Sequence, residues 1–298
     1  RICIIMLPEI SKLIKKLDSL DYVVEEELAT ILLLMLKLKK PLLLEGPPGV
    51  GKTEAAHIIA SYLNTKLIRL QCYEGLDVNS AIYEWNYQKQ LLSIKLTEGS
   101  ELSPSEKESH IFGDEFLLKR PLLQAITESD KAPVLLIDEI DRADEEFEAF
   151  LLELLSAYQI SIPEMGTIKA NHIPIVVLTS NRTRELSDAL KRRCLYHWVP
   201  YPEFQKELAI INKHLPDINQ VLATQLVKFV QYLRSLKLDK SPGISESIDW
   251  AEGLIALGAK AFTQDYIDKS LGVILKSDKD ITNIRGQGID SILNEIEA

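Results

Sequence analysis

The sequence predicts an α/β protein in which a parallel sheet of five strands, flanked by helices, is followed by a small all-helical domain. Two observations support this fold class. Across residues 21–200, short apolar segments alternate with helical patterns, which is typical of parallel strands joined by crossover helices. After Pro200 and Pro202 the strand-like segments stop, and only helical patterns follow.

The expected strands are short, and several are continuously apolar rather than alternating. Such runs are expected when both faces of a strand are buried. On periodicity alone, a run such as 42–44 fits a buried helix equally well. The length of the runs and the turn residues that follow them favour strands. The five segments are 41–45, 67–71, 134–138, 173–179 and 195–199.

The two prolines mark a domain boundary, because the residue before a proline is disfavoured in a helix. Helical patterns follow over 203–214, 219–238, 245–257, 265–277 and 284–298, the last interrupted by Gly286 and Gly288. We therefore expect a helical lead-in over 1–20, an α/β domain over 21–200 and a helical domain over 201–298.

The charge balance excludes some classes of function. The chain has 298 residues, with 34 basic and 44 acidic side chains and a net charge of −10. This balance argues against a protein whose main task is to coat DNA or an anionic membrane. No apolar run approaches the roughly 20 residues that a membrane-spanning helix needs.

The three cysteines, Cys3, Cys72 and Cys194, are far apart and odd in number. This spacing predicts neither a disulfide framework nor a zinc site. We interpret each as a small buried apolar residue, which fits a reducing, cytoplasmic location. His57 lies on the apolar side of a predicted helix, and we interpret it as a packed core residue.

The strongest functional signal matches the pattern G-x-x-x-x-G-K-[ST] between an expected strand and the helical segment 54–63. Glycines allow backbone N–H groups to surround phosphate oxygens, and a helix N-terminus adds partial positive charge. The lysine of this pattern reaches the outer phosphates, and its threonine is a ligand for Mg²⁺. This phosphate loop consists of Gly46, Pro47, Pro48, Gly49, Val50, Gly51, Lys52 and Thr53.

A second signal places two carboxylates, Asp138 and Glu139, directly after the apolar run 134–137. The carboxyl ends of parallel strands are where ligands bind. Asp138 is expected to hold the metal ion of a bound nucleotide, directly or through water, and Glu139 to activate the attacking water. Without the phosphate loop, this pair would fit a solvated strand end equally well.

A third signal is a polar amide at the end of another expected strand. Asn181 follows the run 175–180, and its side chain could orient water beside a terminal phosphate. By itself, an asparagine in this place is more often a turn residue. Its position after the other two motifs favours the functional interpretation.

Together, the three motifs resemble Walker A, Walker B and sensor 1 of the AAA+ ATPases, in that order. Within this class the sequence is most similar to the MoxR family, through PLLLEGPPGVGKTE, LLIDEIDRADEEFEAFLLELL and LSDALKRRC. The segments YEWNYQKQLL and IDWAEGL resemble the group containing CoxD, an accessory ATPase in the maturation of molybdenum-dependent carbon monoxide dehydrogenase. The resemblance extends over residues 20–260.

The resemblance implies an ATP- and Mg²⁺-dependent ATPase that forms a ring, expected to be a hexamer, and remodels or matures a client enzyme. ATP would bind between subunits, where an arginine of the neighbour completes the site. Arg193 matches this position and Arg192 is the alternative, although residues 191–193 also fit a basic helix C-terminus. Arg142 is a further candidate to face a neighbour. The implied partners are a protein with a von Willebrand factor A domain and a client such as a molybdenum-dependent dehydrogenase.

One departure from the family concerns the helical domain. Many MoxR proteins carry an arginine, sensor 2, near the phosphates. In this sequence the matching region contains serine instead, at Ser245. This difference predicts weaker coupling between the helical domain and the terminal phosphate.

Two further elements are predicted around these motifs. Residues 73–133 are more than the crossover of about 10 to 12 residues that a parallel strand pair needs, so extra structure is expected there. Residues 159–169 predict a hairpin, with β-like flanks around a Pro-x-x-Gly turn. Either element could contact a client or could be an ordinary surface loop.

Alternative functions remain open on the sequence. A nucleotide-gated adaptor with little turnover would be consistent with the absence of sensor 2, whereas Glu139 argues against it. A nucleic-acid motor is disfavoured by the net charge of −10. Nothing in the phosphate loop distinguishes ATP from GTP.

Overall fold

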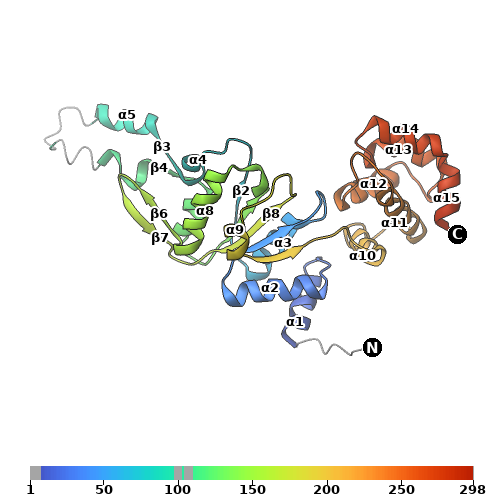
Figure 1. The fold of residues 1–298 in the computed structure, drawn as a ribbon, viewed down its shortest axis with the longest axis horizontal. Coiled ribbons are helices and arrows are strands. Elements are labelled where there is room, and N and C mark those ends of the chain that lie inside the picture. The colour runs from blue at the N-terminus through green and yellow to red at the C-terminus, as the bar shows by residue number, and fades with distance from the viewer. Residues whose placement is uncertain (1–7, 97–102, 104–109, 298) are drawn as a thin grey trace. The chain divides into compact units, whose positions relative to one another are not determined.

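The computed structural model describes residues 8–96, 103 and 110–297, and the chain divides into two compact units (Figure 1). The helical unit comprises the described residues of 1–26, 46–52 and 198–298. The sheet unit comprises those of 27–45 and 53–197. Part of the expected lead-in, residues 1–7 with Cys3, lies outside the described residues.

The sheet unit contains the parallel five-stranded sheet that the sequence predicts, with strand order β2-β5-β8-β1-β9. Each strand lies within two residues of its expected position. The strands are β1 (Leu42–Glu45), β2 (Leu67–Gln71), β5 (Val134–Asp138), β8 (Ile175–Ser180) and β9 (Leu195–Trp198).

Register brings the carboxyl ends of the strands to one edge. Gln71 of β2 is level with Asp138 of β5, and Glu45 of β1 is level with Ser180 of β8. The residues that follow these strands therefore meet at the same edge, as the sequence motifs require.

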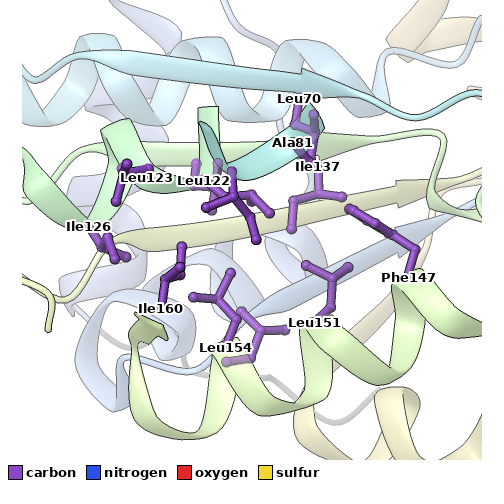
Figure 2. Packing of buried hydrophobic residues seen from close by; sticks show 14 of the residues in the cluster. Leu70, Ala81, Leu122, Leu123, Ile126, Ile137, Phe147, Leu151, Leu154 and Ile160 are labelled. Atoms are coloured by element: carbon purple, nitrogen blue, oxygen red, sulfur yellow. The ribbon is translucent and has the colours of Figure 1, made fainter. Parts of the chain in front are cut away.

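The core of the sheet unit lies between the sheet and the helices on one face. Figure 2 shows Ile137 of the sheet directed toward Phe147 and Leu151 of α8 (Glu145–Ala157), and Leu70 beside Ala81. Neighbouring strand residues are equally buried on the other face. This two-sided burial explains why the strands read as continuous apolar runs.

Residues 73–133 hold extra structure, as predicted. A small antiparallel pair, β3 (Tyr83–Trp85) with β4 (Leu117–Lys119), accompanies the helices. These helices are α4 (Val78–Ile82), α5 (Tyr87–Leu96), the short η1 (Asp114–Phe116) and α7 (Pro121–Thr127).

The predicted hairpin is confirmed as β6 (Gln159–Ile162) paired with β7 (Gly166–Lys169). Gly166 has φ 82°, a conformation that glycine adopts without steric cost. The other helical elements of the sheet unit are α2 (Glu26–Leu38), α3 (Lys52–Leu63), η2 (Ile140–Arg142) and α9 (Asp188–Arg193). The first residues of α2 and α3 belong to the helical unit.

The helical unit has its own core, in which the rings of Phe229, Trp250 and Phe262 contact one another edge to face. A buried ion pair joins Arg234 and Glu207 at 2.6 Å. Its helices are α1 (Pro8–Asp18), α10 (Phe204–His214), α11 (Gln220–Ser235), α12 (Ile244–Ala256), α13 (Gln264–Ile274), α14 (Asp278–Gln287) and α15 (Ile289–Glu297).

The interruption expected at Gly288 is confirmed, because Gly288 with φ 82° ends α14 before α15 begins. Gly286 lies inside α14, which begins at Asp278 rather than at residue 284. The interpretation of His57 is wrong. His57 is exposed rather than packed in the core. Across the described residues, no helix combines the length and apolar character that a membrane span requires.

Candidate active site

The phosphate loop follows β1 and leads into α3. Gly49 and Gly51 have φ values of 73° and 87°, which are strained for other residues. The Lys52 ammonium is buried and donates to the carbonyl oxygens of Gly46 at 2.8 Å and Pro47 at 2.6 Å. The loop thus folds around its own lysine, which keeps the positive charge inside the turn.

Within the helical unit, the N-terminus of α12 contacts the phosphate loop through backbone alone. The Ile244 amide donates to the Gly49 carbonyl at 2.7 Å. A Cβ atom on Gly243 would lie 2.7 Å from the Gly49 Cα, which is closer than side chains approach. Ser245, the residue singled out by the sequence, is exposed. The contact to the phosphate loop therefore comes from the backbone of Gly243 and Ile244 rather than from the Ser245 side chain.

Asp138 ends β5, and its side chain is only 4% exposed. Its Oδ1 atom accepts hydrogen bonds from Thr53 Oγ1 at 3.1 Å and Thr179 Oγ1 at 2.5 Å. Its Oδ2 atom accepts from Arg69 Nε at 3.0 Å and Nη2 at 2.6 Å. The structure thus brings together Thr53 and Asp138, which the sequence paired only by motif.

Glu139 has a left-handed backbone, with φ 55° and ψ 48°, a conformation that costs a non-glycine residue about 1 to 3 kcal/mol and is concentrated at functional sites. Its amide donates to Thr179 Oγ1 at 2.9 Å. Its carboxylate forms an ion pair with Arg142 Nε at 2.8 Å. Asn181 Nδ2 approaches the other carboxylate oxygen at 3.5 Å. Glu139 and Asn181 therefore lie together.

Asp141 connects the two strand ends. Its buried carboxylate accepts from the Asn181 amide at 3.2 Å and from the Thr183 amide and hydroxyl at 2.8 and 2.7 Å. This arrangement fixes the turn after β8 against the turn after β5. An open cleft of about 610 Å³ lies beside it, lined by Glu74, Gly75, Asp141, Arg142, Ala143, Asp144, Glu145, Thr183 and Arg184.

The two candidate trans-acting arginines do not join this cluster. Arg192 and Arg193 are exposed at the end of α9, just before β9. The Leu195 amide donates to the Pro41 carbonyl at 2.8 Å, so this segment lies at the amino edge of the sheet. Asp138 and Glu139 lie at the carboxyl edge. Within one chain, the arginines and the carboxylates are at opposite ends of the strands.

Sequence reasoning missed Arg69, Thr179 and Asp141. Arg69 and Gln71 are polar residues at alternate positions of an otherwise apolar strand, and this alternation places both side chains on one face. The partner of that face depends on strand order, which the sequence did not provide. Arg142 was considered as a residue facing a neighbour, whereas here it pairs with Glu139 of its own chain.

Cys72 is buried, as expected, whereas Cys194 is only partly buried. Burial raises the pKa of the Cys72 thiol to about 12, with further contributions from the charges of Asp138, Asp141 and Glu139. Burial also raises the pKa of Cys194 to about 12, although Arg193 acts in the opposite direction. Both thiols are therefore protonated at neutral pH and are poor nucleophiles.

The oxygen donors suit a hard cation. The Thr53 hydroxyl and the Asp138 carboxylate lie in hydrogen-bond contact, and Mg²⁺ prefers one or two such ligands together with phosphate and water oxygens. The described residues hold no cluster of three or more histidine, cysteine or acidic side chains that could bind a metal without such help. The donor set thus fits a magnesium–nucleotide complex.

Comparison with known proteins identifies relatives and similar folds. An uncharacterized protein of Staphylococcus haemolyticus is 28% identical over 229 residues, which cover 75% of this chain and 78% of the relative. One from Staphylococcus epidermidis matches to the same extent.

Among solved structures, two mutant forms of Thermotoga maritima RuvB resemble the chain in fold. One has a TM-score of 0.52 at 20% identity, covering 86% of this chain and 72% of the other. The second has a TM-score of 0.50 at 22% identity, covering 85% and 70%.

The family described as "ATPase family associated with various cellular activities (AAA)" matches residues 42–199, just over half of the chain. This span runs from the first strand of the sheet, through the phosphate loop and the carboxylates, to the end of the last strand. The chain therefore belongs to the AAA family of ATPases.

Proposed function

We propose that this chain hydrolyses ATP in a Mg²⁺-dependent reaction and works as an oligomeric ring. The observation that carries the proposal is the meeting of Asp138, Glu139 and Asn181 at the carboxyl edge of the sheet, with Thr53 hydrogen-bonded to Asp138. This edge is where a parallel sheet binds ligands.

In the proposed reaction, each residue has a separate task. Lys52 and the loop amides bind the phosphates, and Thr53 and Asp138 hold Mg²⁺, which would neutralise charge on the phosphates. Glu139 accepts the proton of the attacking water, and Asn181 orients that water. The ion pair with Arg142 holds the Glu139 carboxylate at 2.8 Å. This pair occupies one carboxylate oxygen, Oε2, and we propose that it restrains Glu139 until the contact loosens.

The opposite placement of the arginines supports action between subunits. Arg193, with Arg192 as the alternative, is exposed at the amino edge of the sheet, so it can reach only a second chain's phosphates. An arginine in this role stabilises the charge that develops on the transferring phosphoryl group. We therefore propose a ring, expected to be a hexamer, in which each subunit completes its neighbour's site.

The finer assignment rests on resemblance. We propose membership of the MoxR branch, near the CoxD-type group. Expected partners are a protein with a von Willebrand factor A domain and a client such as a molybdenum-dependent dehydrogenase, in the cytoplasm. The division into 1–20, 21–200 and 201–298 remains our proposal for the functional domains.

The test is ATP turnover per subunit, measured across a wide range of protein concentration. We expect turnover to rise with concentration and then saturate, because active sites completed between subunits form only in the assembled state. Glu139→Gln is the blank, and it should keep nucleotide binding because the phosphate loop is intact.

Flat or absent turnover in the native protein would contradict the proposed ring motor. Retained nucleotide binding with such a result would favour the adaptor alternative. Turnover that rises on addition of single- or double-stranded DNA, with salt-dependent binding, would instead favour a nucleic-acid motor.

A further inference from the structure

Arg69 lies in the sheet unit and places its guanidinium directly on the Asp138 carboxylate. Both Nε and Nη2 donate to the same oxygen, Oδ2, at 3.0 and 2.6 Å. The Asp138 side chain is 4% exposed, whereas the Arg69 side chain is 50% exposed. A buried anion is therefore paired with a cation that still reaches solvent.

The register of the sheet explains the pairing. Gln71 is level with Asp138 across the β2–β5 pair, and Arg69 lies two residues earlier on the same face of the strand. The same guanidinium also donates from Nη2 to Gln71 Oε1 at 2.5 Å. Arg69 thus has two partners on one face, one buried and one exposed.

The carboxylate of Asp138 has no spare acceptor position in this arrangement. An ionised carboxylate offers about four lone-pair sites, and four N–H or O–H donors fill them. A cation can therefore bind Asp138 only if one donor leaves.

The donors differ in how easily they can leave. Thr179 is buried and also accepts the Glu139 amide, so its movement would disturb a second residue. Thr53 is itself an expected ligand of the metal. Arg69 is half exposed and has Gln71 as an alternative partner. Its guanidinium would also be repelled by a divalent cation at the same oxygen.

We propose that Arg69 is a placeholder cation. Its guanidinium neutralises Asp138 when no divalent cation is bound, and it moves from Oδ2 toward Gln71 when Mg²⁺ and nucleotide arrive. This inference rests on the proposed role of Asp138 in holding Mg²⁺. Without such a placeholder, a buried carboxylate would stand unpaired beside Glu139 and Asp141, which is costly.

The test measures how much Mg²⁺ is needed for binding of a fluorescent, non-hydrolysable ATP analogue. Arg69→Met keeps the apolar stem of the side chain and removes the competing charge. We expect the half-saturating Mg²⁺ concentration to fall about fivefold, the factor expected for loss of one partly exposed ion pair. Arg69→Lys keeps a charge but lacks the planar guanidinium. Its half-saturating Mg²⁺ concentration should lie between those of the native protein and Arg69→Met.

A second readout uses thermal unfolding without nucleotide and with the metal chelated. Arg69→Met should then unfold about 2 to 4 °C below the native protein, as expected for the loss of roughly 1 kcal/mol. Saturating Mg²⁺ and analogue should remove this difference, because the placeholder is no longer in use.

The control is Arg120→Met, which removes an arginine whose partner, Glu84, is an exposed residue of β3. It should leave the Mg²⁺ requirement unchanged. An unchanged or raised requirement in Arg69→Met, with a normal Mg²⁺ dependence in the native protein, would overturn the placeholder alone. Analogue binding that ignores Mg²⁺ in both the native protein and Asp138→Asn would overturn the proposed role of Asp138 and the placeholder with it.

Discussion

The two edges of the sheet in the sheet unit differ in how their charged residues are paired within the chain. At the carboxyl edge, Asp138 and Glu139 each have an arginine partner from the same chain. The amino edge carries basic residues just before β1 and just before β9, and none of these forms an ion pair among the described residues. They are Lys39, Lys40, Lys191, Arg192 and Arg193.

A single chain therefore pairs the two carboxylates of its own site, and it leaves the five basic residues at the amino edge without an ion-pair partner in the part of the chain that the structure describes. The carboxylates are neutralised internally, so the cluster is stable without a ligand. Of these cations, Lys191 is half-buried and the others are exposed, so they are available to a negatively charged partner, which suits a contact made by a second subunit.

The largest effect is expected at the amino edge. Arg193→Ala should lower ATP turnover about 10³-fold, since an arginine acting in trans can contribute 10³–10⁵ in rate. Folding should be unaffected because the side chain is exposed. Steady-state turnover at saturating ATP measures this effect.

Mixing provides the control for action between subunits. Arg193→Ala mixed with Glu139→Gln should recover turnover, because some interfaces then combine a native arginine with a native Glu139. A mixture as inactive as its components would mean that Arg193 does not act between subunits. Arg192→Ala is the matched variant, and a loss confined to it would transfer the role to the alternative residue.

A smaller loss is expected from Asn181→Ala at the carboxyl edge. Removing the amide that approaches Glu139 at 3.5 Å should reduce turnover by about 10²-fold, the lower range for a group that assists proton transfer. Binding of the ATP analogue should remain. If binding falls in parallel with turnover, Asn181 serves the fold of the site and not the water.

Arg142→Met tests whether the internal pair restrains Glu139. Loss of the 2.8 Å ion pair should raise basal turnover about threefold, since exposed pairs contribute less than about 1 kcal/mol. Arg120→Met offers a comparison, because Arg120 pairs with the exposed Glu84 instead. A fall in turnover for Arg142→Met would mean that Arg142 supports catalysis.

The smallest effect concerns the cysteines, one at each edge. Carboxylates contribute to the raised pKa of Cys72, whereas Arg193 lowers that of Cys194. Arg193→Ala should therefore raise the pKa of Cys194 further. At a pH below 12 this change lowers the thiolate fraction, so alkylation of Cys194 should slow about twofold, as expected for the loss of one exposed charge. Cys72 should be unaffected. Mass spectrometry after timed alkylation measures each site, and equal slowing at both would indicate a global change instead.

The sequence predicted the strands, the phosphate loop and the polar residues at the strand ends, because each depends on local pattern. It did not predict Arg69 on Asp138, since β2 and β5 are neighbours only through the order β2-β5-β8-β1-β9. Ser245 was chosen for its side chain, while the contact to Gly49 comes from the backbone of Ile244. Contacts that depend on strand order or on backbone atoms cannot be predicted from the identities of the residues alone.

The left-handed backbone of Glu139 has a consequence for how this sequence can change. Glycine would adopt φ 55° without steric cost, so selection for folding alone would favour glycine there by about 1 kcal/mol. Glutamate at this position therefore carries a backbone cost that glycine would not. The site is therefore a place where stability and activity oppose each other, and variants selected only for heat resistance are expected to lose their function there first.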